Sequence, residues 1–427
     1  MSDPNPAAAP LPNNPFRPGA GQQPVYLAGR TKEQDIFRQM LDQRPVTQNV
    51  IVTGLRGVGK TVLLETLKPI AQGNSWLWTG NDLSESTSLT EERVARRLVV
   101  DIAALLSAHI EITKETVRPG FNTGAEIEAH PLSFDDLWAT YESAPGLISD
   151  KLKAVFADVT HYISDGPEHG IVFAYDEAQN LADHALAKEY PLSLLLDLFS
   201  SLQRQYHNKS FMLVLTGLPT LFPRLNEART YTERMFHVLQ LDRLSPDEAR
   251  AAVVEPLKIT NSALKFGDAT IDKIVSMSGG YPYFIQFIGK EVFDTWIGKI
   301  KSGVAPSVPM AEILEKLDQD FFSPRWVRVS DRQQQFMKVI ATLPNGEEEF
   351  SVPEIVKASR ETLKSGFSPS HAIQILQALA ERGLIYRNRR GSYCFAVPLL
   401  ARFIERQPWD PVSLKTDAAA SVSRQPV

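Results

Sequence analysis

The sequence predicts an α/β protein: a parallel sheet core of the P-loop type, then an all-helical lid, then a C-terminal winged helix-turn-helix. Short apolar runs alternate with helical patterns up to residue 216, as in a parallel sheet. From residue 245 only helical patterns follow, and near the C-terminus three amphipathic segments precede a hairpin pattern. These three observations define the predicted fold class.

The expected strands are apolar, four to six residues long in most cases, and bounded by turn residues. We expect strands at 49–53, 76–78, 170–175 and 211–216. Helices are expected at 31–42, 62–67, 91–108 and 192–206. Ser245-Pro246-Asp247-Glu248 is a typical helix start, with proline at the first helical position. The helices that follow are expected at 246–257, 268–278, 283–297 and 310–321.

The C-terminal segment predicts three helices and a hairpin. DRQQQFMKVIATL, VPEIVKAS and SPSHAIQILQALAERG are the helices, and LIYRNRRGSYCFAV alternates around a turn at 388–391. In the third helix we expect the apolar face to be Ile373, Leu376, Leu379 and Ala380.

The predicted organisation has five parts. Residues 1–24, with seven prolines, are expected to be a disordered arm. The core is 25–244, with an irregular insertion at 112–150, followed by the helical lid at 245–323. The winged helix is 324–407 and a flexible tail is 408–427.

Composition excludes several classes of protein. Of the 427 residues, 43% are hydrophobic and 22% charged, which excludes a mostly disordered or membrane-embedded chain. A single cysteine, Cys394, excludes an internal disulfide, and no run of eighteen apolar residues or signal-like start is present. We therefore expect a cytoplasmic protein with no membrane segment. Residues 325–407 carry 13 Lys+Arg against 8 Asp+Glu, a mild bias toward a polyanion in a chain of net charge −5.

The strongest motif lies between a predicted strand and a predicted helix. It is G-x-x-x-x-G-K-T, and its glycines let backbone N–H groups approach phosphate oxygens at a helix N-terminus. Lys60 would neutralise the β- and γ-phosphates, and the Thr61 hydroxyl would face Mg²⁺. The nucleotide-binding residues are Gly54, Leu55, Arg56, Gly57, Val58, Gly59, Lys60, Thr61 and Val62.

A pair of carboxylates follows the buried strand IVFAY. Asp176 would hold Mg²⁺ through water, and Glu177 would orient or deprotonate the attacking water. Together with the phosphate-binding loop, the pair predicts ATP and Mg²⁺ as ligands and hydrolysis as the reaction.

These motifs resemble those of a known group of proteins. LAGRTKEQ, GLRGVGKT, YDEAQ and LTGLP, followed by GGYPYFIQ and a winged helix, are similar to the AAA+ and STAND P-loop ATPases, in particular the origin-recognition-like ATPases. The resemblance covers roughly residues 25–405. It implies an ATPase core and a helical lid that closes over the nucleotide, with work done through an attached domain or an oligomer.

The resemblance also implies roles for single residues. Gly29 and Arg30 match the turn near the adenine, and Thr216 matches the polar sensor of the γ-phosphate. Arg234 lies where these ATPases carry an arginine finger for a neighbouring subunit, with Arg229 and Arg224 as competitors. For Thr216 and Arg234 the alternatives are an ordinary hydroxyl at a strand end and an ordinary surface arginine.

One segment departs from the origin-recognition pattern. The segment 279–284, at the start of the lid helix, contains no cation, although an arginine that touches the γ-phosphate is expected there. Its Gly-x-Pro, with Pro282, is instead similar to STAND ATPases, in which the proline packs by the nucleotide. Helix initiation is the alternative role for this proline.

The predicted winged helix offers candidate DNA contacts. His371 and Gln374 would meet base edges, and Arg387, Arg389 and Arg390 would meet phosphates. Winged helices also dock proteins, so the first hypothesis is an ATPase, assembled as a homo-oligomer with ATP, that binds double-stranded DNA. The alternative is a STAND-like signalling switch with slow turnover and protein partners, in a stress or antiviral response. A third reading is a regulator without hydrolysis.

Overall fold

The computed structural model describes residues 13–43, 45–117, 125–302, 308–389, 391–409 and 414. They form two compact units, of which one is interrupted in sequence. Unit 1 comprises the described residues of Met1–Gly29, Leu55–Gly59 and Asp242–Val427, and unit 2 comprises those of Arg30–Gly54 and Lys60–Leu241. No helix in these residues is both long and apolar enough to cross a membrane.

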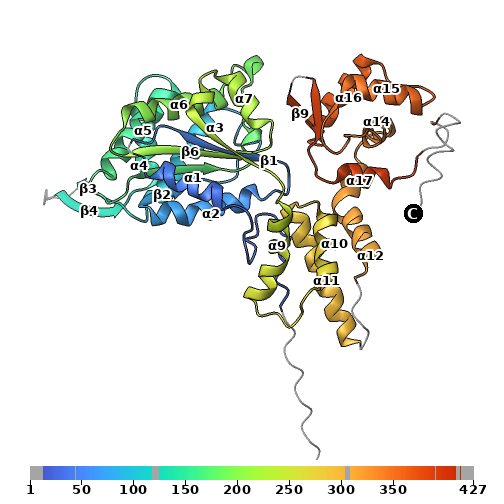
Figure 1. The fold of residues 1–427 in the computed structure, drawn as a ribbon. Coiled ribbons are helices and arrows are strands. Elements are labelled where there is room, and N and C mark those ends of the chain that lie inside the picture. Colours follow the sequence, from blue (N-terminus) through green and yellow to red (C-terminus); the bar gives the residue numbers. More distant parts are fainter. Residues whose placement is uncertain are drawn as a thin grey trace, which may run out of the picture. The chain divides into compact units, whose positions relative to one another are not determined.

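Unit 2 contains a five-stranded sheet in which every neighbouring pair is parallel (Figure 1). In the order of the sheet the strands are β2 (Trp76–Thr79), β5 (Gly170–Tyr175), β6 (Ser210–Gly217), β1 (Asn49–Gly54) and β7 (Phe236–Leu241). The four strands expected from the sequence are present. The edge strand β7 was not predicted, because its sequence FHVLQL alternates only partly and is half-exposed.

Helices cover both faces of this sheet. On one face lie α1 (Thr31–Leu41) and α2 (Lys60–Gly73). On the other lie α3 (Glu91–Leu106), α5 (Ile148–Tyr162) and α6 (Pro191–Gln205), which share a core with the strands. At its centre Phe156 packs edge-on against Phe211, with ring centroids 5.0 Å apart. The predicted α/β class, with a parallel core, is therefore confirmed.

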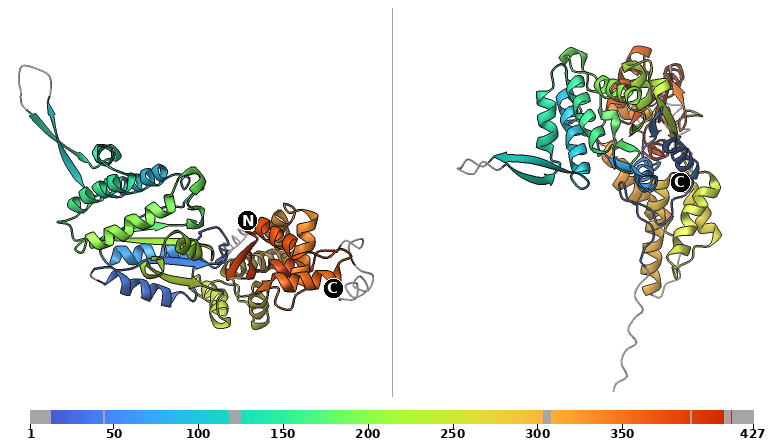
Figure 2. Two further views of the ribbon diagram at one scale, coloured as in Figure 1. Left: turned by 90° about the horizontal axis from the view of Figure 1, so that it is seen from above. Right: turned by 90° about the vertical axis from the view of Figure 1, so that its left-hand side faces the viewer.

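The segment 112–150 is not irregular, contrary to our expectation. It forms an antiparallel hairpin of β3 (Glu111–Val117) and β4 (Ala125–Pro131), then α4 (Phe134–Ser143). The hairpin projects from the rest of unit 2 (Figure 2). In β3 and β4 most residues are polar, so the alternation that predicts a half-buried strand is missing from the sequence. The capping box of Ser133 and Asp136 fixes the start of α4.

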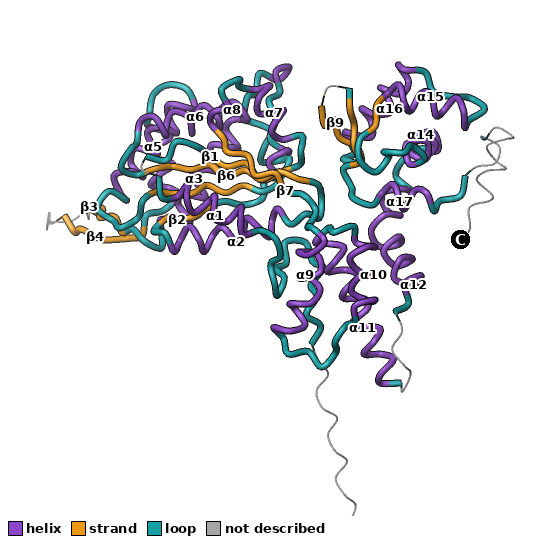
Figure 3. Tube along the Cα trace, viewed as in Figure 1, coloured by secondary structure: helices purple, strands orange, loops and turns teal. Residues whose placement is uncertain are grey.

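The middle of unit 1 is entirely helical in the residues described (Figure 3). It contains α9 (Pro246–Ile259), α10 (Asp268–Ser278), α11 (Pro282–Lys301) and α12 (Met310–Leu317). The helix expected at 310–321 changes after Leu317 into a π-helical turn, Asp318–Phe322, and then α13 (Ser323–Trp326).

The C-terminal part of unit 1 continues the same hydrophobic core. Its helices are α14 (Asp331–Ala341), α15 (Val352–Thr362), α16 (Pro369–Glu381) and α17 (Leu400–Glu405). Strands β8 (Phe350–Ser351), β10 (Ser392–Phe395) and β9 (Ile385–Arg389) form an antiparallel sheet in that order. The expected apolar face of α16 was partly wrong: Ile373 is 42% exposed and Ala380 is exposed, whereas Ala372 and Ile375 are buried. Both changes move the buried face about one residue along the helix.

The N-terminal arm is ordered from residue 13, which corrects the expectation for 13–24; residues 1–12 lie outside the described residues. Phe16 is 2% exposed and its ring stacks 6.0 Å from that of Phe266. The Arg17 backbone N–H donates to Gln286 Oε1 at 2.9 Å, and Asn14 Nδ2 donates to the carbonyl of Lys290 at 3.1 Å. A single buried aromatic residue within a proline-rich segment fixes the arm to α11.

Parts of the predicted tail are also packed. Leu414 is buried and bridges to Leu363, and Trp409 packs against the core of unit 1. The rest of the expected tail, 410–413 and 415–427, lies outside the described residues.

Candidate functional site

The predicted phosphate-binding loop follows β1 and leads into α2. Two of its glycines, Gly57 and Gly59, have φ angles of 80° and 92°, which only glycine adopts without strain. A Cβ added to Gly59 would meet no atom within 4 Å, so the loop is open where a phosphate is expected. The Lys60 ammonium donates to the carbonyl of Gly54 at 3.0 Å. These features fit a phosphate cradle at a helix N-terminus.

Asp176 joins the hydroxyl groups of two motifs in unit 2. Its side chain lies directly after β5 and is 4% exposed. Thr61 Oγ1 donates to its Oδ2 at 2.5 Å, and Thr216 Oγ1 donates to its Oδ1. Sequence reasoning placed these three residues in one site, and the structure brings them together. Thr216 is fully buried and its hydroxyl is directed at the carboxylate that was expected to position Mg²⁺.

Glu177 is exposed and held in an unusual backbone conformation. Its φ of 53° and ψ of 33° are left-handed, which costs a residue with a side chain about 1–3 kcal/mol. Its N–H donates to Asp176 Oδ1 at 2.7 Å, and Gln179 Nε2 donates to its carboxylate. The strain turns the carboxylate away from the strand, where it can contact water.

A third carboxylate, not found from the sequence, approaches this pair. Asp82 forms a bridge with Asp176, and burial, followed by the charges of Asp176 and Glu177, raises the pKa of Asp82. The adjacent Asn81 donates to Asp101, a buried residue of α3, at 3.0 Å. Nothing in the local sequence around Asp82 signals this approach, because it follows from the parallel pairing of β2 with β5.

The described residues contain no cluster of three or more His, Cys, Asp or Glu suited to hold a metal ion. A P-loop metal needs no such cluster, because Mg²⁺ keeps several waters and takes phosphate oxygens. Thr61 and Asp176 supply the hydroxyl and the carboxylate that such a site requires, so the residues present fit Mg²⁺ bound with nucleotide.

The predicted adenine turn is partly explained by packing. Gly29 has a φ of 65°, and a Cβ there would lie 2.6 Å from the carboxyl carbon of Glu248. Arg30 is buried, with its Nη1 3.8 Å from Glu33 Oε1. The adenine contacts of this turn stay a prediction.

Within unit 1, the segment Leu55–Gly59 contacts the start of α11. The N–H of Tyr283 donates to the carbonyl of Gly57 at 3.1 Å. Pro282 occupies the first helical position, as its alternative role required. Gly57 lacks a side chain where Tyr283 packs, since a Cβ would come within 3.1 Å of the tyrosine Cβ.

The three candidate finger arginines have different surroundings in unit 2. Arg224 donates to the carbonyl of Gln179, and Arg229 donates twice to Asp197, at 2.9 and 2.7 Å. Although burial alone would raise it, the hydrogen bonds from Arg229 and Tyr231 lower the pKa of Asp197. Within the described ranges, the exposed Arg234 has no side-chain hydrogen bond or ion pair.

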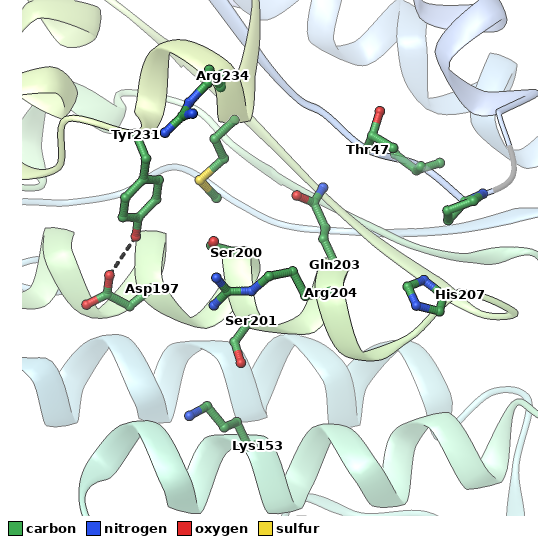
Figure 4. Close-up of a pocket in the computed structure, with 13 residues that line it drawn as sticks. Thr47, Lys153, Asp197, Ser200, Ser201, Gln203, Arg204, His207, Tyr231 and Arg234 are labelled. Atoms are coloured by element: carbon green, nitrogen blue, oxygen red, sulfur yellow. Dashed lines mark hydrogen bonds between the residues drawn. The ribbon is translucent and has the colours of Figure 1, made fainter.

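Arg234 borders an open groove of about 860 Å³ (Figure 4). Three other groups that can be cationic, Lys153, Arg204 and His207, also line the groove, with Tyr231 bonded to Asp197 at 2.6 Å. The groove adjoins Thr47, which precedes β1, whereas the phosphate-binding loop follows β1. Arg234 therefore lies at the opposite end of the strand from its own loop.

The predicted DNA contacts are only partly within the described residues. Gln374 and Arg387 are exposed, and the ring of His371 lies 5.6 Å from that of Phe367. Arg390 and the side chain of Arg389 lie outside the described residues. The buried Cys394 is bonded to Tyr386 within the hairpin, so it has a packing role.

The parallel sheet, the loop between β1 and α2, and the group formed by Lys60, Thr61, Asp176 and Thr216 define the protein as having an AAA+ ATPase fold. The comparisons agree: residues 26–214 match the family model of the AAA ATPase domain. Residues 319–404 match a domain of unknown function, DUF8462. The comparison with curated proteins found no match.

Two solved structures have a similar fold. One is the Walker-type ATPase paby2304 of Pyrococcus abyssi, 16% identical with a TM-score of 0.53, covering 88% of this chain and 96% of that chain. The other is the ORC2 protein of Aeropyrum pernix in ADPNP–ADP complexes, 13% identical with a TM-score of 0.52, covering 91% and 95%. The chain therefore resembles origin-recognition-like AAA+ ATPases in fold, as the sequence motifs implied.

Proposed function

We propose that the protein binds ATP with Mg²⁺, hydrolyses it, and couples the nucleotide state to DNA binding by its C-terminal winged helix. The observation that carries the hydrolysis is the group around Asp176, in which one buried carboxylate accepts from both Thr61 and Thr216. A cytoplasmic location stays a prediction.

Within this proposal each residue has a distinct task. The loop N–H groups and Lys60 bind the phosphates, and Thr61 and Asp176 hold the metal, which polarises the phosphoryl oxygens. Glu177, exposed and fixed by Gln179, orients the attacking water and accepts its proton. Thr216 keeps the carboxylate of Asp176 in place.

Two variants test these roles in a pair. Lys60→Ala should weaken ATP binding at least about a hundredfold, whereas Glu177→Gln should leave binding intact and lower turnover about a hundredfold or more. The control is Arg38→Ala, which removes only the exposed ion pair with Asp35 on α1. A wild-type rate in Glu177→Gln would remove that residue from the mechanism.

The DNA proposal is supported by the exposed Gln374 and Arg387 and by the mild positive charge of the C-terminal segment. The test is ATP turnover with and without double-stranded DNA at low and moderate salt. Stimulation that fades as salt rises is expected, because phosphate contacts release counterions. Binding of ATP without stimulation and with slow turnover would instead favour the signalling switch.

One observation favours that second candidate. The lid start supplies no cation, and its Tyr283 N–H is bonded to the loop carbonyl of Gly57. In such a switch the lid would respond to the presence of nucleotide, and its partners would be proteins. Pull-down with wild-type and Lys60→Ala protein, each with ATP or ADP, separates the two by asking for a nucleotide-dependent protein partner.

We also assign a trans-acting role to Arg234 in a homo-oligomer. Its support is the open groove and the lack of a side-chain partner among the described residues, whereas Arg224 and Arg229 are engaged within the chain. An arginine supplied to a neighbouring subunit must be free in the isolated subunit and exposed.

A further inference from the structure

Two arginines of unit 1 lie close together beside the segment Leu55–Gly59. Gly57 is bonded to the N–H of Tyr283, whose ring centroid lies 5.2 Å from that of Phe321. The guanidinium carbon of Arg325 lies 4.3 Å from the centroid of Phe321, and Arg325 also donates to the carbonyl of Phe321. A continuous series of contacts therefore connects the loop to Arg325.

The electrostatics of this pair are unfavourable as they stand. Arg325 is half-buried, and burial, followed by the positive charge of Arg56, lowers the pKa of its guanidinium. The Arg56 Nη2 lies 3.2 Å from where a Cβ on Gly383 would be, so its side chain is against the turn after α16. Across the described ranges neither arginine pairs with a carboxylate. Two desolvated like charges without an anion cost free energy, which a bound anion would recover.

The backbone around Arg325 supports a specific placement. Arg325 belongs to α13, which directly follows the π-helical turn Asp318–Phe322. Such turns interrupt a regular helix at a cost and occur frequently at functional sites. The turn is anchored by Phe322, which is 1% exposed and stacks on Phe403. The irregular turn sets the direction in which Arg325 points.

We propose that Arg325, assisted by Arg56, binds the terminal phosphate of ATP held by the loop and so distinguishes ATP from ADP. The proposal rests on the proposed function. Guanidinium groups bind phosphate oxygens in a planar, two-bonded geometry, and the lid start at 279–284 has no cation to do this. Arg325 thus takes the place of the missing lid arginine from a position about forty residues further along the chain.

The test compares affinities for ADPNP and ADP, each with Mg²⁺, by calorimetry on the full chain. Arg325→Ala should weaken ADPNP binding about ten- to a hundredfold and change ADP binding less than about threefold, because only the triphosphate carries the extra group. Arg325→Lys should restore part of the preference, since it keeps the charge but not the planar fork.

The matched control is Arg332→Ala. Arg332 also lies over a phenylalanine, 3.9 Å from the centroid of Phe367, and burial also lowers its pKa, but it makes no contact with Leu55–Gly59. It should keep the wild-type ratio of the two affinities. Equal losses for both nucleotides in Arg325→Ala, or an unchanged ratio, would refute the proposal while the ATPase assignment stands. If wild type and Lys60→Ala bind ADPNP equally poorly, the proposed function itself fails, and the role of Arg325 fails with it.

Discussion

Replacing Asp101 with asparagine tests whether a buried charge holds the segment beside Asp176 in place. Asp101 is 2% exposed on α3. Its carboxylate accepts hydrogen bonds from the Arg97 guanidinium, from Asn81 Nδ2 at 3.0 Å and from the Tyr175 hydroxyl at 2.9 Å. The donors come from α3, from β5 and from the residue after β2, so one side chain ties three elements together.

The magnitude follows from these contacts. Removing one partner of a buried ion pair costs about 3–5 kcal/mol of unfolding free energy. The Arg97 side chain is 31% exposed, so water compensates part of its lost partner, and we expect about 2–3 kcal/mol for Asp101→Asn. An asparagine also presents an NH₂ group to donors, which leaves at least one of them unsatisfied.

The assay is native-state hydrogen exchange resolved by segment, because the chain forms two compact units and a single melting midpoint would average them. Amides of α3 and β5 should exchange faster by the stated free energy, while amides of α10 and α11 should not change. The control is Asp35→Asn, which removes an exposed pair with Arg38 and should cost less than about 0.5 kcal/mol. If Asp101→Asn costs no more than this control, the carboxylate does not hold the segment.

Three further predictions follow from the site and the arm. Phe16→Ala should destabilise unit 1 by about 3 kcal/mol, read from slower-exchanging amides of α11, and Phe16→Leu by less; a cost below about 1 kcal/mol would mean the arm packs loosely. Because the folded pKa of Asp82 is raised, its ionisation destabilises the fold above that pKa, so Asp82→Asn should be more stable than wild type at pH 7. That gain should vanish below pH ~4, and a gain independent of pH would contradict the assigned charge repulsion. Arg234→Ala should lower ATP turnover only at protein concentrations where subunits assemble, and equal loss in the dilute monomer would exclude a role in a neighbour's site.

The nucleotide-binding motif was predictable because its chemistry depends on local sequence. Gly57, Gly59 and Lys60 must be adjacent for the backbone to close around phosphate, and Asp176 must end a buried strand. The alternation of strands and helices was likewise legible, since burial on both faces makes parallel strands continuously apolar.

What the sequence missed depends on contacts between distant segments. Asp82 approaches Asp176 only because β2 pairs with β5, and β7 is a strand because β1 offers it an edge. The β3–β4 hairpin carries mostly polar residues, so no pattern marked it. Phe16 was hidden in a composition typical of disorder, because one aromatic residue among prolines does not alter an average.

The packing of the arm has a consequence for biosynthesis. Asn14 bonds to Asp294 across 280 residues of chain. At a ribosomal rate of about 5–20 residues per second, the N-terminal segment emerges about 15–60 s before its partners on α11 exist. During that time Phe16 has no core to enter. Unit 1 therefore closes only after its first-made segment meets helices made much later, which makes the nascent chain dependent on factors that shield exposed aromatic residues.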